Sequence, residues 1–188
     1  GMPYDSDTGR NLAAAITSVM SGQAYLTSAE IAKAMGPFPH YSVNQQSFIE
    51  VIGMHKAAAA IVPTLGVAAD LYEASLDTWA AALTLGKKFG YRNAQISVLA
   101  PTGTIAFMMD CDTTGVEPDI ALVKYKKLVG GGFLKIVNRT VPMALDRLGY
   151  SAQEVEAILA HVDERETIEG SPDLKSEHLS IFDCAFRA

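Results

Sequence analysis

The chain has 188 residues, of which 49% are hydrophobic and 19% charged, a balance typical of one globular domain with a buried core, expected here over residues 1–188. The formal net charge of −6 argues against an extended nucleic-acid interface, which needs dense lysine and arginine. The longest apolar runs, such as residues 57–62, are far shorter than the roughly 20 residues that cross a bilayer, and no export signal is visible, so we expect a cytoplasmic protein without a membrane segment.

Two helices are predicted in the first 40 positions. Apolar residues recur at helical spacing from Leu12 to Met20, and Gly22 is expected to end this helix. Thr27 and Glu30 then have the spacing of a capping box, in which each side chain bonds a free N–H group of the first turn. A short second helix is therefore predicted to begin at Thr27 and to end at Gly36.

Two longer helices are predicted next. Asn44 is expected to cap a helix whose apolar residues between positions 48 and 62 fall on one stripe, until Pro63 stops it. Residues 67–89 have apolar side chains on more than one side, which predicts a helix largely surrounded by protein. Gly90 is expected to mark its C-terminal end.

Short β-type patterns occur at residues 95–100, closed by Pro101, and at residues 133–137. A second capping box, formed by Ser151 and Glu154, opens another predicted helix. Helices therefore outnumber strands, and the predicted fold class is predominantly α with a small β component (α+β). Two strands cannot close a barrel by themselves.

The turn Pro101-Thr102-Gly103-Thr104 lies between the first candidate strand and an apolar stretch that can begin a helix. Gly103 lets the backbone approach a ligand, and the threonines offer hydroxyls beside free N–H groups, which is the outline of a phosphate-binding site. An ordinary strand-to-helix turn has the same residues, and this one lacks the lysine of a Walker loop and the three-glycine spacing of a dinucleotide site. From these residues alone, both interpretations stay open.

Four carboxylates follow within ten positions, at Asp110, Asp112, Glu117 and Asp119. Such a group is compatible with a hard cation, but it fits no EF-hand register, and aspartate and threonine also build capped turns. The histidines show no metal-ligand spacing either. We therefore assign no metal site.

The cysteines and the basic residues are given structural interpretations. Cys111 and Cys184 form no CxxC pair, so neither a disulfide framework nor a zinc site is indicated, and Cys111 is interpreted as a buried structural thiol. The one basic cluster contains Lys124, Lys126 and Lys127 and is interpreted as a solvated face.

The central part of the chain reads APTGTIAFMMDCDTTGVEPDIALVKYKKLVGGGFLKIVN. This run resembles the corresponding block of the adenosylcobalamin-dependent, or class II, ribonucleotide reductases. The resemblance extends to the flanks and therefore covers nearly the whole chain. Four further runs resemble that family in the same order: GRNLAAAITSVMSGQAYLTSAEIAKAMGPFPHY, GYRNAQISVLAPTGTI, VPMALDRLGY and TIEGSPDLKSEHLSIFDCAF.

The resemblance implies an internal or C-terminal piece of the catalytic barrel region, hence part of a ten-stranded α/β barrel that reduces ribonucleotides to deoxyribonucleotides. In such enzymes adenosylcobalamin supplies a radical to one cysteine, and a further cysteine pair provides electrons. The PTGTI loop is implied to grip the substrate phosphates. That role falls on Pro101, Thr102, Gly103, Thr104 and Ile105.

The sequence departs from the family in two respects: the Asn-Pro-Cys motif that carries the thiyl radical is absent from it, and the electron-donating cysteine pair cannot be identified. The chain alone is therefore expected to be inactive, to hold no cofactor and to contribute no catalytic residue. Its expected ligand is a ribonucleotide, and its expected partner is the remaining reductase polypeptide or a second copy of itself, without nucleic acid or membrane. Two alternatives stay open: a stand-alone nucleotide- or phosphate-binding module, and an interaction protein without reductase activity.

Overall fold

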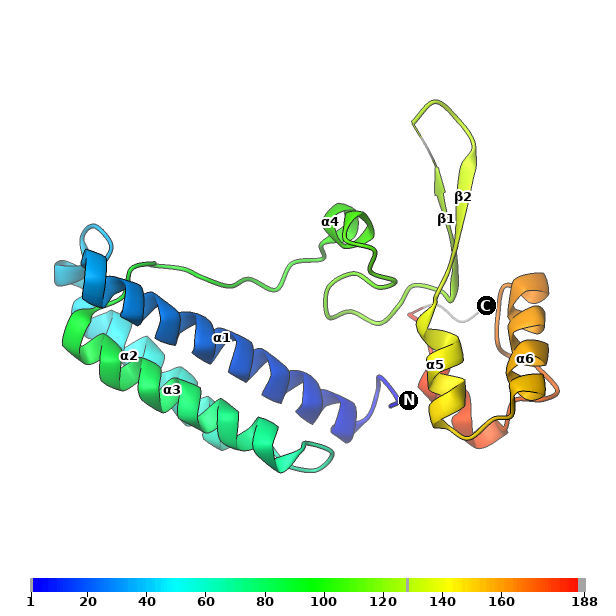
Figure 1. Ribbon diagram of the computed structural model, residues 1–188, viewed down its shortest axis with the longest axis horizontal. Coiled ribbons are helices and arrows are strands. Elements are labelled where there is room, and N and C mark those ends of the chain that lie inside the picture. The colour runs from blue at the N-terminus through cyan, green and yellow to red at the C-terminus, as the bar shows by residue number, and fades with distance from the viewer. Residues whose placement is uncertain (1, 128, 186–188) are drawn as a thin grey trace. The chain divides into compact units, whose positions relative to one another are not determined.

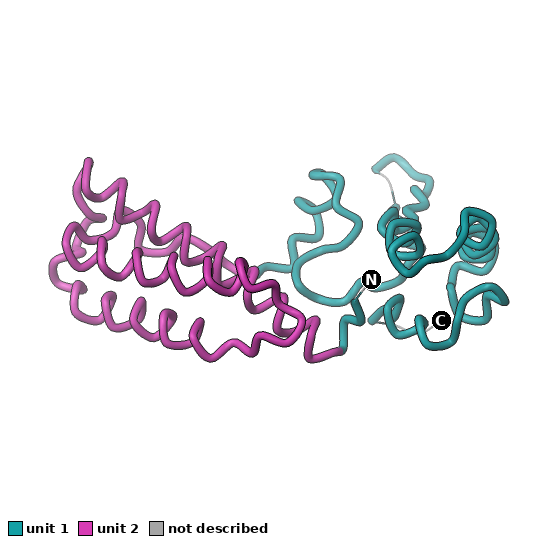
Figure 2. Tube along the Cα trace, turned by 60° about the horizontal axis from the view of Figure 1, so that its bottom comes forward, with its two compact units in different colours: residues 1–5, 99–188 teal, residues 6–98 magenta. Residues whose placement is uncertain are grey.

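The computed structural model describes residues 2–127 and 129–185 (Figure 1). Its elements in chain order are α1 (Asp7–Met35), α2 (Tyr41–Ala60), α3 (Ala69–Phe89), α4 (Gly103–Met108), β1 (Val123–Lys127), β2 (Phe133–Val137), α5 (Thr140–Arg147), α6 (Ala152–Arg165) and the 3-10 helix η1 (Ser176–Phe182). These residues form two compact units (Figure 2). We name them the helical unit, residues 6–98, and the mixed unit, residues 2–5 together with the described part of 99–185.

The predicted fold class is confirmed in its coarse form. Helices dominate, and the described residues contain two strands and no closed barrel. The membership of these strands in a ten-stranded barrel and the single domain expected over the whole chain stay predictions. Among the described residues, no helix is both long enough and apolar enough to span a lipid bilayer.

The helical unit is organised around α3, which packs against both α1 and α2. Its core is mainly aromatic: Tyr91 is fully buried, its ring lies near those of Tyr25 and Phe48, and its hydroxyl donates to the carbonyl of Ala82 at 2.8 Å. Burial raises the pKa of Tyr91 far above its ordinary value, with smaller contributions from Tyr41 and Tyr25. The Tyr91 phenol therefore stays protonated and continues to donate its hydrogen bond at neutral pH.

Helix α1 is continuous over 29 residues, so the predicted stop at Gly22 and the predicted start at Thr27 are both wrong. Gly22 is buried where α1 meets α3, and a Cβ atom there would overlap the side chain of Thr78. The glycine thus permits close packing of two helices and does not end one. Helix α1 begins after Ser6, whose Oγ accepts a first-turn N–H at 3.0 Å, and the predicted end at Gly36 is confirmed.

The predicted cap of α2 is also wrong, although its end is correct. Asn44 lies inside α2 and donates its side-chain amide to the carbonyl of His40 at 3.0 Å. The helix begins earlier, at Tyr41, because this residue is buried in the aromatic core of the helical unit. The ends of α2 before Pro63 and of α3 before Gly90 are confirmed.

The mixed unit contains an antiparallel hairpin in which Val123 of β1 lies opposite Val137 of β2. The prediction of β2 is confirmed. The predicted strand at residues 95–100 is wrong, because no strand in the described part of the chain pairs with it, and a strand is stable only beside a partner. Strand β1 was not predicted; three of its five residues are lysines, a residue type that is depleted in strands.

The hydrophobic core of the mixed unit is built mainly by α5, α6, η1 and the loops between them. Leu145 of α5 and Ile158 of α6 are fully buried, surrounded by Leu122, Val123, Val141, Tyr150, Val162, Ile168 and Phe182. The predicted capping box of α6 is confirmed: Ser151 accepts the N–H of Glu154, and the Glu154 carboxylate accepts the N–H of Ser151 at 2.7 Å.

The two predicted capping boxes, one confirmed and one wrong, give a matched pair of substitutions. Ser151→Ala removes a real cap and is expected to lower the free energy of unfolding by about 1 kcal/mol. Thr27→Ala replaces an exposed residue inside α1 with a better helix former, so stability should stay the same or rise by a few tenths of a kcal/mol. Urea unfolding followed by circular dichroism measures both, and equal losses would contradict the assignment of α1 as one helix.

Candidate functional site

The five residues of the PTGTI loop, residues 101–105, lie at the start of α4. Pro101 and Thr102 precede the helix, Gly103 is its first residue, and Thr104 and Ile105 follow in its first turn. All five are exposed or half-buried, whereas the next residue, Ala106, is buried and anchors the helix.

The backbone amides of this first turn are open. The N–H groups of Gly103, Thr104 and Ile105 find no acceptor among residues 2–127 and 129–185, whereas the N–H of Ala106 donates to the carbonyl of Thr102 at 2.8 Å. A Cβ atom built at Gly103 would have no neighbour within 4 Å. Such amides suit an anion, because they can donate to it together with the positive end of the helix dipole.

Thr102 holds the loop in an uncommon backbone conformation. Its φ of 49° and ψ of 27° are left-handed, which for a β-branched residue costs about 1–3 kcal/mol. Its Oγ1 accepts the N–H of Gly115 at 3.0 Å, so the loop is tied to the segment that follows α4. The hydroxyl hydrogen of Thr102 is still able to donate to a ligand.

The C-terminal end of α4 is closed by a Schellman motif. The N–H of Asp110 donates to the carbonyl of Phe107 at 3.3 Å, and the N–H of Cys111 donates to that of Ala106 at 2.9 Å. The left-handed position of this motif is usually glycine, but here it is Asp110, with a φ of 61°. A carboxylate therefore stands beside the negative end of the helix dipole, where it needs a cation.

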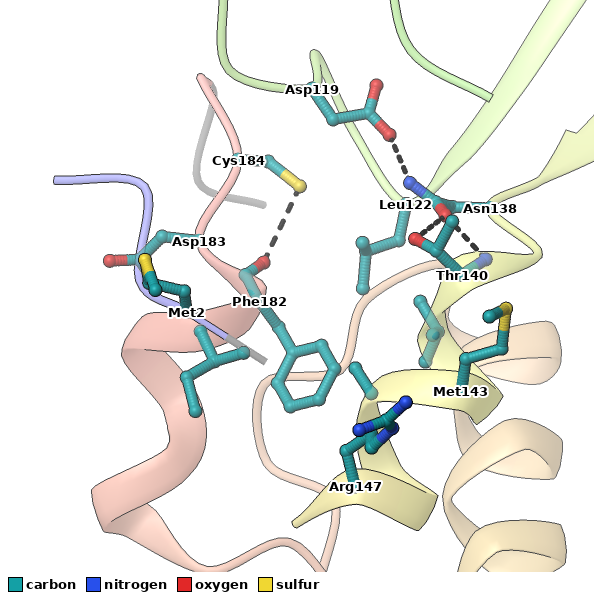
Figure 3. A pocket seen from close by; sticks show the side chains of 13 residues that line it. Met2, Asp119, Leu122, Asn138, Thr140, Met143, Arg147, Phe182, Asp183 and Cys184 are labelled. Carbon is teal, nitrogen blue, oxygen red and sulfur yellow. Dashed lines mark hydrogen bonds between the residues drawn. The ribbon is translucent and has the colours of Figure 1, made fainter. Parts of the chain in front are cut away.

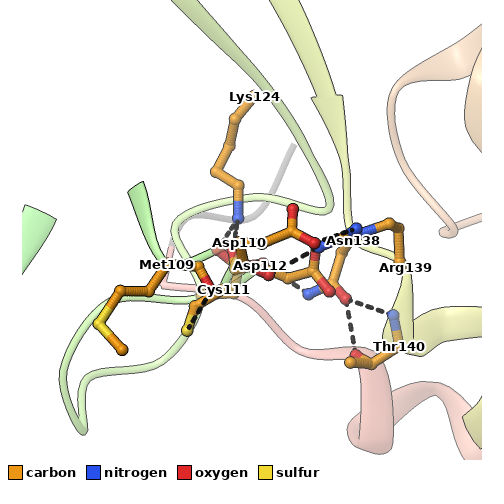
Figure 4. Close-up of polar contacts among 9 residues, drawn as sticks. Met109, Asp110, Cys111, Asp112, Lys124, Asn138, Arg139 and Thr140 are labelled. Atoms are coloured by element: carbon orange, nitrogen blue, oxygen red, sulfur yellow. Dashed lines mark hydrogen bonds and ion pairs between the residues drawn. The ribbon is translucent and has the colours of Figure 1, made fainter. Parts of the chain in front are cut away.

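Arg139, which directly follows the hairpin, supplies that cation (Figure 4). Its Nη1 lies 2.9 Å from Asp110 Oδ2, its Nη2 donates to the Asp110 carbonyl at 2.7 Å, and its Nε lies 3.1 Å from Asp112 Oδ1. The hydrogen bond from Arg139, and then its charge, lower the pKa of Asp110 below its ordinary value. The contribution of this pair to stability is thus present above the ordinary aspartate pKa and is lost as the pH falls through the lowered one.

A second ion pair lies deeper in the same network. Lys124 Nζ is 2.5 Å from Asp119 Oδ1 and donates to the carbonyl of Asp112 at 2.6 Å, while Asn138 donates to Asp119 Oδ2 at 2.8 Å. The side chains of Lys124 and Asp119 are only 12% and 11% exposed, so the solvated face expected for Lys124 is wrong. Three of the four clustered carboxylates therefore face basic or amide groups, and no metal-holding group of three acidic, histidine or cysteine residues occurs in the described ranges.

The two cysteines lie in different surroundings. Cys111 is exposed, so its interpretation as a buried thiol is wrong. Cys184 is half-buried beside a pocket of about 380 Å³ whose polar lining includes Asp119, Asn138 and Thr140 (Figure 3). Burial raises the pKa of the Cys184 thiol, and the charge of Asp119 adds to the effect, so the thiolate that a nucleophile needs is disfavoured.

The sequence predicted the PTGTI loop as a phosphate site but gave no indication of the residues that contact the segments around it. Arg139 and Asn138 belong to no recognisable local pattern, and Arg139 lies 29 positions from Asp110 along the chain. The available signal was indirect: a cluster of carboxylates requires cations, and Lys124 and Arg139 are among the basic residues that follow it.

The family model of the ribonucleotide reductase barrel domain matches residues 1–188. The chain is 52% identical over 187 residues to a vitamin B12-dependent ribonucleotide reductase of Rhodopirellula baltica, covering 100% of the chain and 18% of that protein. It is 51% identical over 186 residues to the protein of that name from Streptantibioticus cattleyicolor, covering 98% of the chain and 31% of the relative. A vitamin B12-dependent ribonucleoside-diphosphate reductase of Mycobacterium tuberculosis is 24% identical over 185 residues, covering 98% of the chain and 20% of that protein.

The chain thus spans between about a fifth and a third of the length of these relatives. The match covers the whole chain, including the helices, the PTGTI loop, the hairpin and the segment that carries Arg139. The chain therefore belongs to the ribonucleotide reductase family, as part of its barrel domain, and the relatives that it matches are named vitamin B12-dependent.

Proposed function

We propose that this chain supplies the substrate-phosphate loop, residues 101–105, to a vitamin B12-dependent reductase that converts ribonucleotides to deoxyribonucleotides. The observation that carries the proposal is the set of three N–H groups at Gly103, Thr104 and Ile105 that have no acceptor among the described residues, at an exposed helix start. If these amides were already hydrogen-bonded inside the protein, they could not donate to a phosphate.

The chemistry of the loop is that of anion binding. Backbone N–H groups and the Thr104 hydroxyl donate to phosphate oxygens, and the dipole of α4 adds up to about 1 kcal/mol at an exposed site. Gly103 leaves the approach to the backbone clear, and Thr102 fixes the turn through its bond to Gly115. These groups hold and orient the substrate, and bond-breaking belongs to other parts of the enzyme.

The reactive sulfur comes, on this proposal, from the rest of the reductase, and the remaining strands come from there or from a second copy of the chain. Asp110 precedes Cys111 and Asp183 precedes Cys184, so neither cysteine has an Asn-Pro-Cys neighbourhood. The hairpin β1–β2 provides two strands, and a ten-stranded barrel needs others from outside this segment. With both cysteines present as free thiols, we place the protein in the cytoplasm.

Adenosylcobalamin belongs to the complete enzyme, where it supplies the radical. We expect this chain to form no cobalamin site of its own; the pocket beside Cys184, about 380 Å³, has the size of a small-molecule site, and a corrin ring with its nucleotide tail is larger. We assign no residue of this chain to the cofactor.

The substitution Gly103→Val tests the proposal in a full-length reductase that carries this segment. Valine fits the protein because no atom lies within 4 Å of a Cβ at this position, but it blocks the approach of a phosphate to the amides. We expect the KM for the ribonucleotide to rise about a hundredfold, equivalent to the loss of one or two charge-assisted hydrogen bonds. Steady-state kinetics with nucleoside diphosphates and triphosphates measures this change.

The control is Gly53→Val, the same replacement at a helix glycine in the other unit that also has open space around it. It should leave KM unchanged. An unchanged KM in Gly103→Val would overturn the proposed role of the loop.

The isolated chain separates this proposal from a stand-alone binding module. With adenosylcobalamin and a dithiol it should form no deoxyribonucleotide, since its thiols have the wrong neighbourhoods. Detectable product would contradict the proposal that the reactive sulfur is borrowed. Saturable binding of a nucleoside diphosphate by the isolated chain, lost in Gly103→Val, would show that the loop functions without the rest of the barrel.

A further inference from the structure

We infer that Arg139 is a positioning residue for the PTGTI loop: it grips both segments that hold α4 and so fixes where the open amides point. This inference rests on the proposed function of the loop. The residues involved are shown in Figure 4, where the Arg139 side chain reaches toward Asp110 and Asp112.

The short helix needs such support. Helix α4 has six residues, far fewer than an isolated helix needs for stability in water, and only Ala106 among them is buried. Both residues that flank it in left-handed conformation, Thr102 and Asp110, are of types that pay a conformational penalty there. The position of α4 is therefore determined by contacts at its two ends.

Arg139 contacts the C-terminal end of α4 directly and is connected to the N-terminal end through the segment that follows the helix. At the C-terminal end it binds Asp110 directly, through the carboxylate and the carbonyl. Toward the N-terminal end it binds Asp112, three residues before Gly115, whose N–H donates to Thr102 at 3.0 Å. One guanidinium thus links the end of α4 to the segment that ties down its beginning.

The backbone that carries Arg139 is itself well anchored. The neighbouring Asn138 is 5% exposed, its N–H donates to the carbonyl of Leu122 at 2.8 Å, and its Oδ1 accepts both the N–H and the hydroxyl of Thr140. Its side-chain amide also donates to Asp119, the partner of Lys124. Arg139 therefore extends from a fixed point at the root of the hairpin.

The chemistry of arginine suits this role, whereas that of lysine does not. Three separate acceptors are bound by Nε, Nη1 and Nη2, in the fork geometry that a planar guanidinium provides. A lysine has the charge but presents it at one point, so it would keep one of these contacts and lose the shared grip on both segments.

The test uses a full-length reductase that carries this segment. We expect Arg139→Gln to raise the KM for the ribonucleotide about fivefold, a modest change because the pair is partly exposed. The kcat should stay within about twofold, since the loop binds substrate and does no chemistry. Arg139→Lys should give a smaller rise, and the hydrogen-bonded amides of Ala106 and Cys111, at the two ends of α4, should exchange faster in both variants.

Asp110→Gly removes the ion pair with Arg139 from the other side. Glycine favours the left-handed position, so the Schellman turn is kept while the carboxylate that Arg139 holds is removed. The single variant should raise KM like Arg139→Gln, and the double variant should show less than the product of the two effects, as expected for one coupled contact. Lys135→Gln, which breaks the ion pair with Asp163 elsewhere in the mixed unit, is the control and should leave KM unchanged.

The possible results distinguish the positioning role of Arg139 from the proposed function of the loop. If Gly103→Val raises KM but Arg139→Gln does not, or lowers kcat alone, the positioning role is overturned while the proposed function stands. If neither variant changes KM, the proposed function itself fails. A fall in melting temperature shared by Arg139→Gln and Lys135→Gln, without the KM change, would assign Arg139 to general stability only.

Discussion

Replacing Gly86 by alanine is expected to destabilise the helical unit by about 2–4 kcal/mol, because the new methyl group would overlap the ring of Tyr91. Tyr91 is fully buried and its hydroxyl is bonded to Ala82, so the ring cannot move without giving up packing and a hydrogen bond. Alanine is intrinsically the better helix former by about 1 kcal/mol, but the overlap outweighs this gain. Urea unfolding followed by the fluorescence of Trp79, the single tryptophan of the chain, reports on this unit directly.

Gly53→Ala is the matched control. Gly53 also lies inside a helix, α2, but a Cβ atom there meets nothing within 4 Å. The same substitution should therefore raise the free energy of unfolding by up to about 1 kcal/mol, with the opposite sign to Gly86→Ala. If both variants were stabilised, the tight contact between Gly86 and Tyr91 would be wrong.

The second large effect is expected for Leu145→Ala in the mixed unit. Leu145 is fully buried in the core formed with Ile158 and Val162, and its truncation leaves a cavity as well as removing apolar contacts. We expect a loss of about 2–5 kcal/mol in the free energy of unfolding. Hydrogen exchange of the amides of α5 and α6, read by mass spectrometry, measures this loss within the unit.

Met143→Ala is the control for that substitution. Met143 lies in the same helix as Leu145 but is 67% exposed, so its truncation should change the free energy of unfolding by less than about 0.5 kcal/mol. Similar losses in the two variants would mean that α5 buries a different face from the one described.

Elements specified by nearby residues could be predicted from the sequence. The end of α3 at Gly90, the capping box of α6 and strand β2 each depend on side chains within a few positions of one another. The PTGTI loop was placed correctly at a helix start for the same reason, since a proline and a glycine at a turn restrict the backbone locally.

The errors occurred where distant residues decide the structure. Gly22 has the local pattern of a helix end, but its contact with Thr78 makes it a packing position inside α1. Residues 95–100 have a strand pattern and no partner strand in the described chain. Arg139 could not be linked to Asp110 because nothing local connects positions 29 apart.

The hairpin β1–β2 affects how this chain behaves in isolation. Each strand is paired on one side only among the described residues, so the other margin presents backbone donors and acceptors to any extended peptide that approaches. The side chains of Tyr125, Phe133 and Leu134 are about half exposed or more, so the hairpin offers apolar surface in addition to its free edges. In solution the isolated chain is therefore expected to pair with exposed strands of other proteins or with the hairpin of a second copy, and storage at low concentration will limit this association.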